Sequence, residues 1–142
     1  MYYCPGVDDA LHREVHRKYL NMWTFPPRQT EQTVAQWPNG DRVIKIDSSS
    51  DRHYQEKVKL LHGAIDAKLG CPPHQENCLT TYLYITNGKA VGVAIVHPIE
   101  RAYNIHEDET AELCGQSVRC STAPVPAALG ISRVWVYETH RR

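Results

Sequence analysis

The sequence lacks a net charge, since 16 basic residues balance 16 acidic ones. This balance gives no reason to expect bulk electrostatic binding to DNA or to anionic lipid, although a local basic patch remains compatible with it. No apolar run is long enough to cross a bilayer, so no membrane span is predicted. The first residues, MYYCPGVDDALHRE, lack the apolar core of a signal peptide.

A regular cysteine pattern is absent as well. Five cysteines in 142 residues form an odd, irregularly spaced set, which argues against a secreted disulfide framework and predicts a reducing compartment. The composition is that of a globular protein, with 42% hydrophobic and 23% charged residues. The length is sufficient for one domain with a hydrophobic core of ordinary size.

Two segments have the spacing of amphipathic helices. Residues 8–20, DDALHREVHRKYL, begin with two aspartates where the helix dipole favours negative charge. A second helix is predicted after DSSSD (47–51), a cluster of capping residues, and Gly70 is expected to end it. The predicted apolar stripe of this second helix consists of Val58, Leu61, Ile65 and Leu69.

Two Asn-Gly pairs predict β-hairpins, at Asn39-Gly40 and at Asn87-Gly88, because both residue types tolerate positive φ. The run AVGVAIV predicts a central strand covered on both faces. Residues 104–124 show no clear period and are expected to form a long loop before a final strand in LGISRVWV. The element order predicts an α+β (mixed α/β) fold on a largely antiparallel sheet.

His12 and His16 lie four residues apart, which places both on one helix face in a spacing that suits Zn²⁺. The simpler interpretation is two exposed histidines on an amphipathic helix. Only Cys4 precedes them, so one cysteine and two histidines would leave a tetrahedral site one ligand short.

The end of the chain carries the other candidates. A strand that feeds a basic segment can present backbone N–H groups to a phosphate, although two terminal arginines are more often an exposed tail. Ser132 is the hydroxyl of the strand core, where a local hydrogen bond is the more frequent role than catalysis. Cys120 has no neighbouring histidine in sequence and is predicted to be a half-buried, inert thiol.

Three segments resemble the cohesion-establishment N-acetyltransferases of the Eco/ESCO type, in which a small zinc finger precedes a GNAT-like acetyltransferase domain. DDALHREVHRKYL is similar to the helix of the family's finger, and YLYITNGKAVGVAIVHPIERAY to its β-hairpin. RCSTAPVPAALGISRVWVYETHRR resembles the most specific block, with its C-S, proline and GISR elements followed by an aromatic strand.

This resemblance implies a finger remnant in residues 1–24 and part of a GNAT-like fold in residues 25–142. It implies transfer of acetyl from acetyl-CoA to a lysine of the cohesin SMC subunit, in the nucleus, on chromatin and beside the replication machinery. Ser132 matches the serine of the GISR motif, proposed to help accept the lysine proton. The other matched residues are the zinc-binding His12 and His16, the cofactor-pairing Trp135, Val136 and Tyr137, and the phosphate-loop Arg141 and Arg142.

The sequence also departs from the family pattern. The family's two zinc-binding cysteines would precede Met1, and Cys4 matches neither of them. The rest of the phosphate loop, its helix, an acidic catalytic residue and the last strands would follow Arg142. We therefore expect a chain cut at both ends, with an incomplete zinc site and impaired acetyl-CoA binding. A non-catalytic module that binds chromatin proteins remains the alternative, while the zero net charge counts against a nucleic-acid-binding finger.

Overall fold

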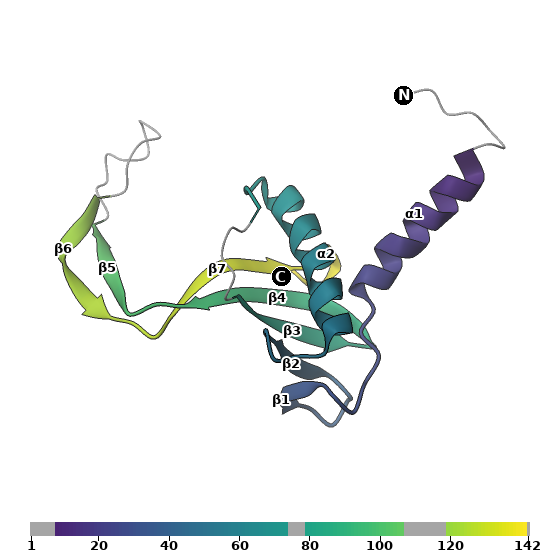
Figure 1. Cartoon of the computed structure of the whole chain (residues 1–142), viewed down its shortest axis with the longest axis horizontal. Helices are drawn as coiled ribbons and strands as arrows, with labels where there is room; N and C mark the ends of the chain where they lie inside the picture. Colours follow the sequence, from purple (N-terminus) through teal and green to yellow (C-terminus); the bar gives the residue numbers. More distant parts are fainter. Residues whose placement is uncertain (1–7, 74–78, 107–118, 142) are drawn as a thin grey trace.

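The computed structural model describes residues 8–73, 79–106 and 119–141. In these residues the body is a five-stranded antiparallel sheet of order β1-β2-β3-β4-β7, and β5 pairs with β6 in a separate two-stranded arm (Figure 1). The elements are α1 (Asp8–Trp23), β1 (Gln32–Gln36), β2 (Arg42–Ile46), α2 (Arg52–Leu69), β3 (Thr80–Thr86), β4 (Lys89–Pro98), β5 (Arg101–His106), β6 (Arg119–Pro126), β7 (Leu129–Val136) and the short 3-10 helix η2 (Glu138–His140). The predicted mixed α/β class with an antiparallel sheet is confirmed.

Both predicted hairpins form. Asn87 and Gly88 have φ values of 49° and 72°, the left-handed conformation that a two-residue turn between β3 and β4 requires. In the β1–β2 turn only Gly40 is left-handed, with φ of 88°, and Asn39 contributes its side chain instead. The Asn39 amide donates to Asp41 Oδ2 at 2.9 Å, so the turn is held by a side-chain bond as well as by its glycine.

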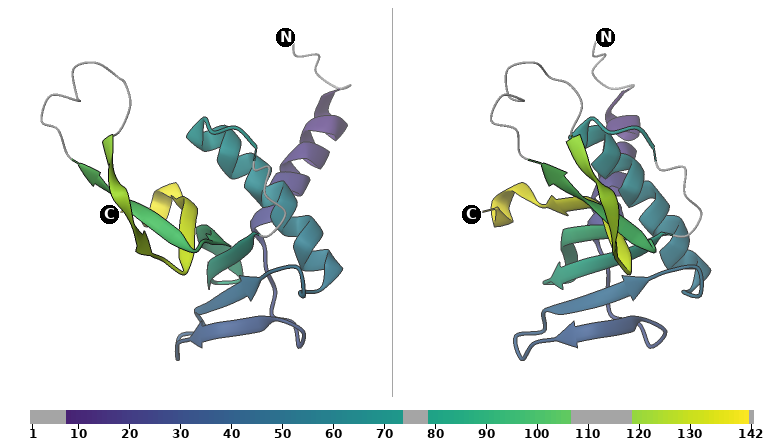
Figure 2. Two further views of the ribbon diagram at one scale, coloured as in Figure 1. Left: turned by 60° about the vertical axis from the view of Figure 1, so that its left-hand side comes forward. Right: turned by 90° about the vertical axis from the view of Figure 1, so that its left-hand side faces the viewer.

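Helix α2 covers one face of the sheet (Figure 2). Asp51 caps its N-terminus by accepting from the backbone N–H of His53, and Gly70 ends it in the left-handed conformation with φ of 65°. Three residues of the predicted stripe are buried, whereas Leu69 is exposed. The core between α2 and the sheet contains Val58, Leu61, Ile65, Ile44, Leu83, Ile85, Val93 and Ile95.

The expectation that β4 is covered on both faces is wrong for the described residues. Val93 and Ile95 are buried against α2, but Gly92 and Ala94 on the opposite face are only half-buried. Figure 2 shows both described helices on the same side of the sheet. The run AVGVAIV appeared evenly apolar because its two half-buried positions hold the small residues Gly92 and Ala94.

The predicted loop at 104–124 is wrong at both of its ends, which belong to the arm strands β5 and β6; residues 107–118 lie outside the described part. Ala102 pairs with Val125 and Tyr103 with Pro124, so the two-stranded arm tolerates proline that a central strand would exclude. Cys120 is exposed on β6 and not half-buried as predicted.

Helix α1 projects from the body (Figure 1), and its residues 10–21 are exposed. Its last residue, Trp23, is buried and packs in the core. Neither described helix is long and apolar enough to cross a membrane. The division between residues 1–24 and 25–142 stays a prediction.

Candidate active site

Strand β7 carries most of the predicted site residues and lies at the edge of the five-stranded sheet. Its inner side pairs with β4, where Trp135 lies opposite Val93 and Val136 opposite Gly92. Beyond the strand, Tyr137 N–H donates to the Val91 carbonyl at 2.8 Å. Because main-chain groups of successive residues in a strand point to opposite sides, the N–H and C=O groups of Val136 face the outer edge.

Ser132 occupies a β-bulge. Arg133 pairs with Ile95 and Ile131 pairs with Val96, so the ladder skips Ser132. Its hydroxyl donates to the Ile95 carbonyl across the ladder at 3.1 Å. Bulges re-aim a side chain and are frequent beside active sites, so the one predicted catalytic residue sits where the strand geometry is locally redirected.

Three aromatic rings gather behind the edge strand. The Trp135 and Trp23 rings stack with centroids 4.6 Å apart, and Tyr137 meets both rings edge-on. Both tryptophans are buried, and their indole N–H groups have no hydrogen-bond partner among the described residues. Trp135 therefore points into the core, and only its main chain can take part in pairing along the open edge.

Arg141 folds back onto this edge. Its Nε donates to the Val136 carbonyl at 2.7 Å, and its Cζ lies 5.9 Å from the centroid of the Trp135 ring. The helical turn η2 makes the return possible, with the Arg141 N–H bonded to the Glu138 carbonyl at 3.3 Å. The Arg141 guanidinium thus occupies the Val136 carbonyl, an acceptor on the outer edge of β7. Arg142 lies outside the described residues.

The comparisons with known proteins point to one family, although no protein-family model matches the chain. N-acetyltransferase ESCO2 of Mus musculus is 29% identical over an alignment of 143 positions that takes in 95% of this chain. N-acetyltransferase ESCO1 of Homo sapiens is 27% identical over 149 positions and 95% of this chain. The acetyltransferase domain of xEco2, solved bound to a CoA conjugate, is 29% identical with a TM-score of 0.67, covering 80% of this chain and 68% of that one.

The chain is a homologue of the Eco/ESCO-type N-acetyltransferases. It spans 23% of the length of the mouse ESCO2 protein and 18% of human ESCO1. The resemblance predicted from LGISRVWV and its neighbours is confirmed, and the relatives that carry it are named as N-acetyltransferases.

The structure brings Ser132, Trp135, Val136, Tyr137 and Arg141 of the Eco/ESCO homologue together along one strand and the turn after it. For an extended cosubstrate, the outward main chain of Val136 is a fitting partner because it offers both a donor and an acceptor. Their roles in binding and catalysis stay predictions.

The two predicted zinc ligands lie elsewhere. His12 and His16 are exposed on α1 with ring centroids 4.8 Å apart. In the described residues no group of three or more His, Cys, Asp or Glu side chains comes together, and Cys4 lies outside them. Two histidines alone do not fit a tetrahedral zinc site.

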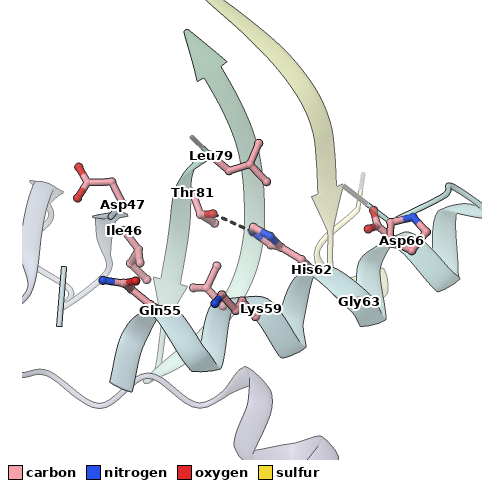
Figure 3. A pocket seen from close by; sticks show the side chains of 11 residues that line it. Ile46, Asp47, Gln55, Lys59, His62, Gly63, Asp66, Leu79 and Thr81 are labelled. Atoms are coloured by element: carbon pink, nitrogen blue, oxygen red, sulfur yellow. Dashed lines mark hydrogen bonds between the residues drawn. The ribbon is translucent and has the colours of Figure 1, made fainter. Parts of the chain in front are cut away.

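A hollow of about 500 Å³ lies beside α2, above the start of β3 (Figure 3). His62 of α2 points toward Thr81 of β3, with Nε2 and Oγ1 2.8 Å apart. Asp66, about one turn further along α2, also lines the hollow and accepts from Arg133 Nε of β7 at 3.1 Å. Asp66 therefore connects the wall of the hollow to Arg133, the residue next to Ser132.

Sequence reasoning did not single out Asp66 and Arg133. Asp66 is 4% exposed, so its carboxylate needs a partner, and Arg133 supplies it. The available signal was an aspartate directly after Ile65, on the border of the apolar stripe of an amphipathic helix.

Proposed function

We propose that this chain is part of an acetyl-CoA-dependent protein-lysine N-acetyltransferase of the Eco/ESCO type. Its substrate is a lysine of the cohesin SMC subunit, and its action establishes sister-chromatid cohesion in the nucleus, on chromatin and beside the replication machinery. The observation that carries the proposal is β7, an edge strand with outward main-chain groups, in a chain that aligns over 80% of its length with a domain solved with a CoA conjugate.

The chemistry demands a group near the acceptor lysine. A free lysine amine has a pKa of about 10.4 and is protonated at neutral pH, so it must lose a proton before it attacks a thioester. The Ser132 hydroxyl donates a hydrogen bond to the Ile95 carbonyl, and a hydroxyl oxygen that donates in this way can also accept a hydrogen bond from the lysine amine. Ser132 thereby orients the lysine and helps its proton to leave to water. The new bond joins the lysine nitrogen to the acetyl carbon, and the carbon–sulfur bond breaks.

Acetyl-CoA supplies the acyl group as a thioester. Along β7, Val136 offers an outward N–H and C=O to the amide-bearing arm, while Trp135 and Tyr137 hold the strand against the core. Arg141 carries the charge for the phosphates, since guanidinium groups bind phosphate oxygens with charge-assisted bonds. To do so it releases the Val136 carbonyl, which makes that acceptor available to the arm.

Calorimetric titration with acetyl-CoA tests the binding step. The chain and the full-length protein encoded by its gene are titrated in parallel, and acetyl transfer to a lysine peptide is followed by mass spectrometry. We expect Ser132→Ala to lower kcat while the Kd for acetyl-CoA changes little, because the hydroxyl acts on the amine. Ser48→Ala, at an exposed serine in the turn before α2, is the matched control.

Three outcomes would contradict the proposal. Absence of acetyl-CoA binding by the full-length protein would contradict the enzymatic function and favour a non-catalytic module that binds chromatin proteins. Equal acetylation of a cohesin SMC head domain and of an unrelated lysine-rich protein would contradict the proposed substrate. A fluorescent fusion found outside the nucleus throughout the cell cycle would contradict the proposed location.

A further inference from the structure

Two cations from different elements approach the buried ring of Trp135. Lys68, in the last turn of α2, places its Nζ 6.0 Å from the centroid of that ring. Arg141, which follows η2, places its Cζ 5.9 Å from the same centroid. Because Trp23 stacks on one face of the ring with the centroids 4.6 Å apart, the remaining face and the rim are left for the two cations. Two positive groups that are far apart in the sequence therefore gather at the C-terminal end of β7.

One carboxylate lies beside these cations. Glu138 Oε1 of η2 is 3.9 Å from Lys68 Nζ, a long separation for an ion pair, whereas Lys18 and Glu14 of α1 are 2.8 Å apart. The Glu138 side chain is 74% exposed, so water weakens its attraction for the ammonium further. Two cations beside one distant carboxylate leave an excess of positive charge, which favours an anionic ligand.

The cations lie where the proposed cosubstrate needs them. In the proposed function the amide-bearing arm pairs with the outward main chain of Val136, which directly follows Trp135. Arg141 reaches the same residue, since its Nε donates to the Val136 carbonyl at 2.7 Å. A cofactor that runs along β7 toward η2 brings its phosphates to this end of the strand. The Lys68 side chain is 36% exposed, so solvent screens its charge less than that of a fully exposed lysine.

We propose that Lys68 is a second phosphate-binding cation of the cosubstrate site, acting beside Arg141 on the phosphates of acetyl-CoA. The inference rests on the proposed function, because it takes acetyl-CoA as the ligand. On binding, the Lys68 ammonium exchanges its long contact with Glu138 for a charge-assisted bond to a phosphate oxygen. The Trp135 ring keeps the ammonium near the end of the strand through a cation–π contact. Helix α2 thereby contributes to the cofactor site as well as to the core.

A purely structural role for Lys68 leads to different expectations. A cation in the last turn of a helix is favoured by the helix dipole, and its contact with Glu138 joins α2 to η2. In that role, loss of either partner should have the same effect. In the phosphate role the Glu138 carboxylate competes with the phosphate for the ammonium. Removal of the two charges should then change the affinity for acetyl-CoA in opposite directions.

The test measures acetyl-CoA binding by calorimetry and acetyl transfer by kinetics in the full-length protein. We expect Lys68→Gln to raise the Kd for acetyl-CoA about 5-fold at low salt and less at high salt, because ions screen a partly exposed charge. The value of kcat/KM for acetyl-CoA should fall by the same factor. For acetyl-pantetheine, which has the thioester and the arm but no phosphate, kcat/KM should not change. Lys68→Arg keeps the charge and should retain the affinity, while Glu138→Gln should lower the Kd.

Lys18→Gln is the matched control, at an exposed lysine paired with a glutamate, and should leave the Kd unchanged. An unchanged Kd in Lys68→Gln would overturn the phosphate role, and so would an equal loss of kcat/KM with acetyl-CoA and with acetyl-pantetheine. Equal losses of affinity in Lys68→Gln and Glu138→Gln would reduce the pair to a structural contact. Each of these results leaves the proposed function standing, whereas failure of the unaltered full-length protein to bind acetyl-CoA would overturn both.

Discussion

Replacing Glu31 by glutamine should strongly destabilise the fold, because it removes the counter-charge of a buried guanidinium. Arg42 Nε donates to Glu31 Oε1 at 2.7 Å, and Arg42 Nη2 donates to Oε2 at 3.2 Å and to the Phe25 carbonyl at 2.7 Å. Tyr54 adds its hydroxyl to Glu31 Oε2 at 3.2 Å. The network holds the segment between α1 and β1 on the sheet.

The expected size follows from burial. The side chains of Arg42 and Glu31 are only 6% and 8% exposed, and removal of one partner from such a pair costs about 3–5 kcal/mol. The glutamine keeps the shape and one acceptor, so we expect the lower end, about 3 kcal/mol. For a domain of this size that corresponds to a fall in Tm of about 10 °C.

Urea unfolding followed by tryptophan fluorescence measures the change. Arg52 and Glu56 form an ion pair of almost the same length, 2.8 Å, but with side chains 90% and 61% exposed. Glu56→Gln is therefore the control, with an expected loss of only about 0.3–0.5 kcal/mol. A second measurement uses Arg42→Met together with Glu31→Gln, which should cost less than the two single losses added. Equal effects of Glu31→Gln and Glu56→Gln would refute the reasoning, because burial would then make no difference.

Three further outcomes are expected. Asp51→Ala removes the N-cap bond to His53 and should lower the unfolding free energy by about 1 kcal/mol, as urea titration would show. Burial and the nearby Glu31 raise the pKa of Tyr54 to about 12, so its contribution to stability is complete below pH 10 and is lost as the pH rises toward 12. Tyr54→Phe should therefore reduce the loss of stability between pH 10 and 12, and an unchanged loss would contradict this role of Tyr54. Arg141→Ala should weaken acetyl-CoA binding by about 10-fold in calorimetry, whereas equal affinity would place Arg141 outside the cofactor site.

Local signals in the sequence were sufficient for the two helices, the strands of the five-stranded sheet and the turns between them, but not for the arm strands β5 and β6. Gly70 and the pair Asn87-Gly88 predict backbone conformations that few other residues adopt, and those conformations are present. The motif LGISRVWV was likewise enough to place Ser132 on a strand. Each of these features depends on residues close together in the chain.

The details of the site depend on partners far away in sequence. The bulge at Ser132 arises from a shift in register against β4, and no residue type near Ser132 announces it. The bond from Arg133 to Asp66 joins residues on different elements, and it becomes visible only when α2 lies on the sheet. The return of Arg141 to Val136 spans only five residues, but it follows from the turn η2, which the sequence analysis did not predict.

The β5–β6 arm has a consequence for the order of folding. Strand β4 leads into β5, β6 leads into β7, and the bonds from Ile99 to Ala128 and from Ala127 to Glu100 join the two pairs into one ribbon. Its outer pair, His106 with Arg119, is much closer in sequence than its inner pair, Pro98 with Leu129. Closing the shorter connection first is cheaper by about 0.8 kcal/mol of chain entropy.

We therefore expect the ribbon to close from the arm inward, so that β7 reaches β4 as the continuation of a hairpin already formed. Ile105→Ala, at an exposed arm residue, should then slow refolding more than it speeds unfolding in stopped-flow measurements. If the substitution instead speeds unfolding more than it slows refolding, the arm forms late in folding, which would contradict this order. On this route the edge strand with its bulge is the last part of the ribbon to pair, and the growing hairpin delivers Ser132 to its place on the sheet.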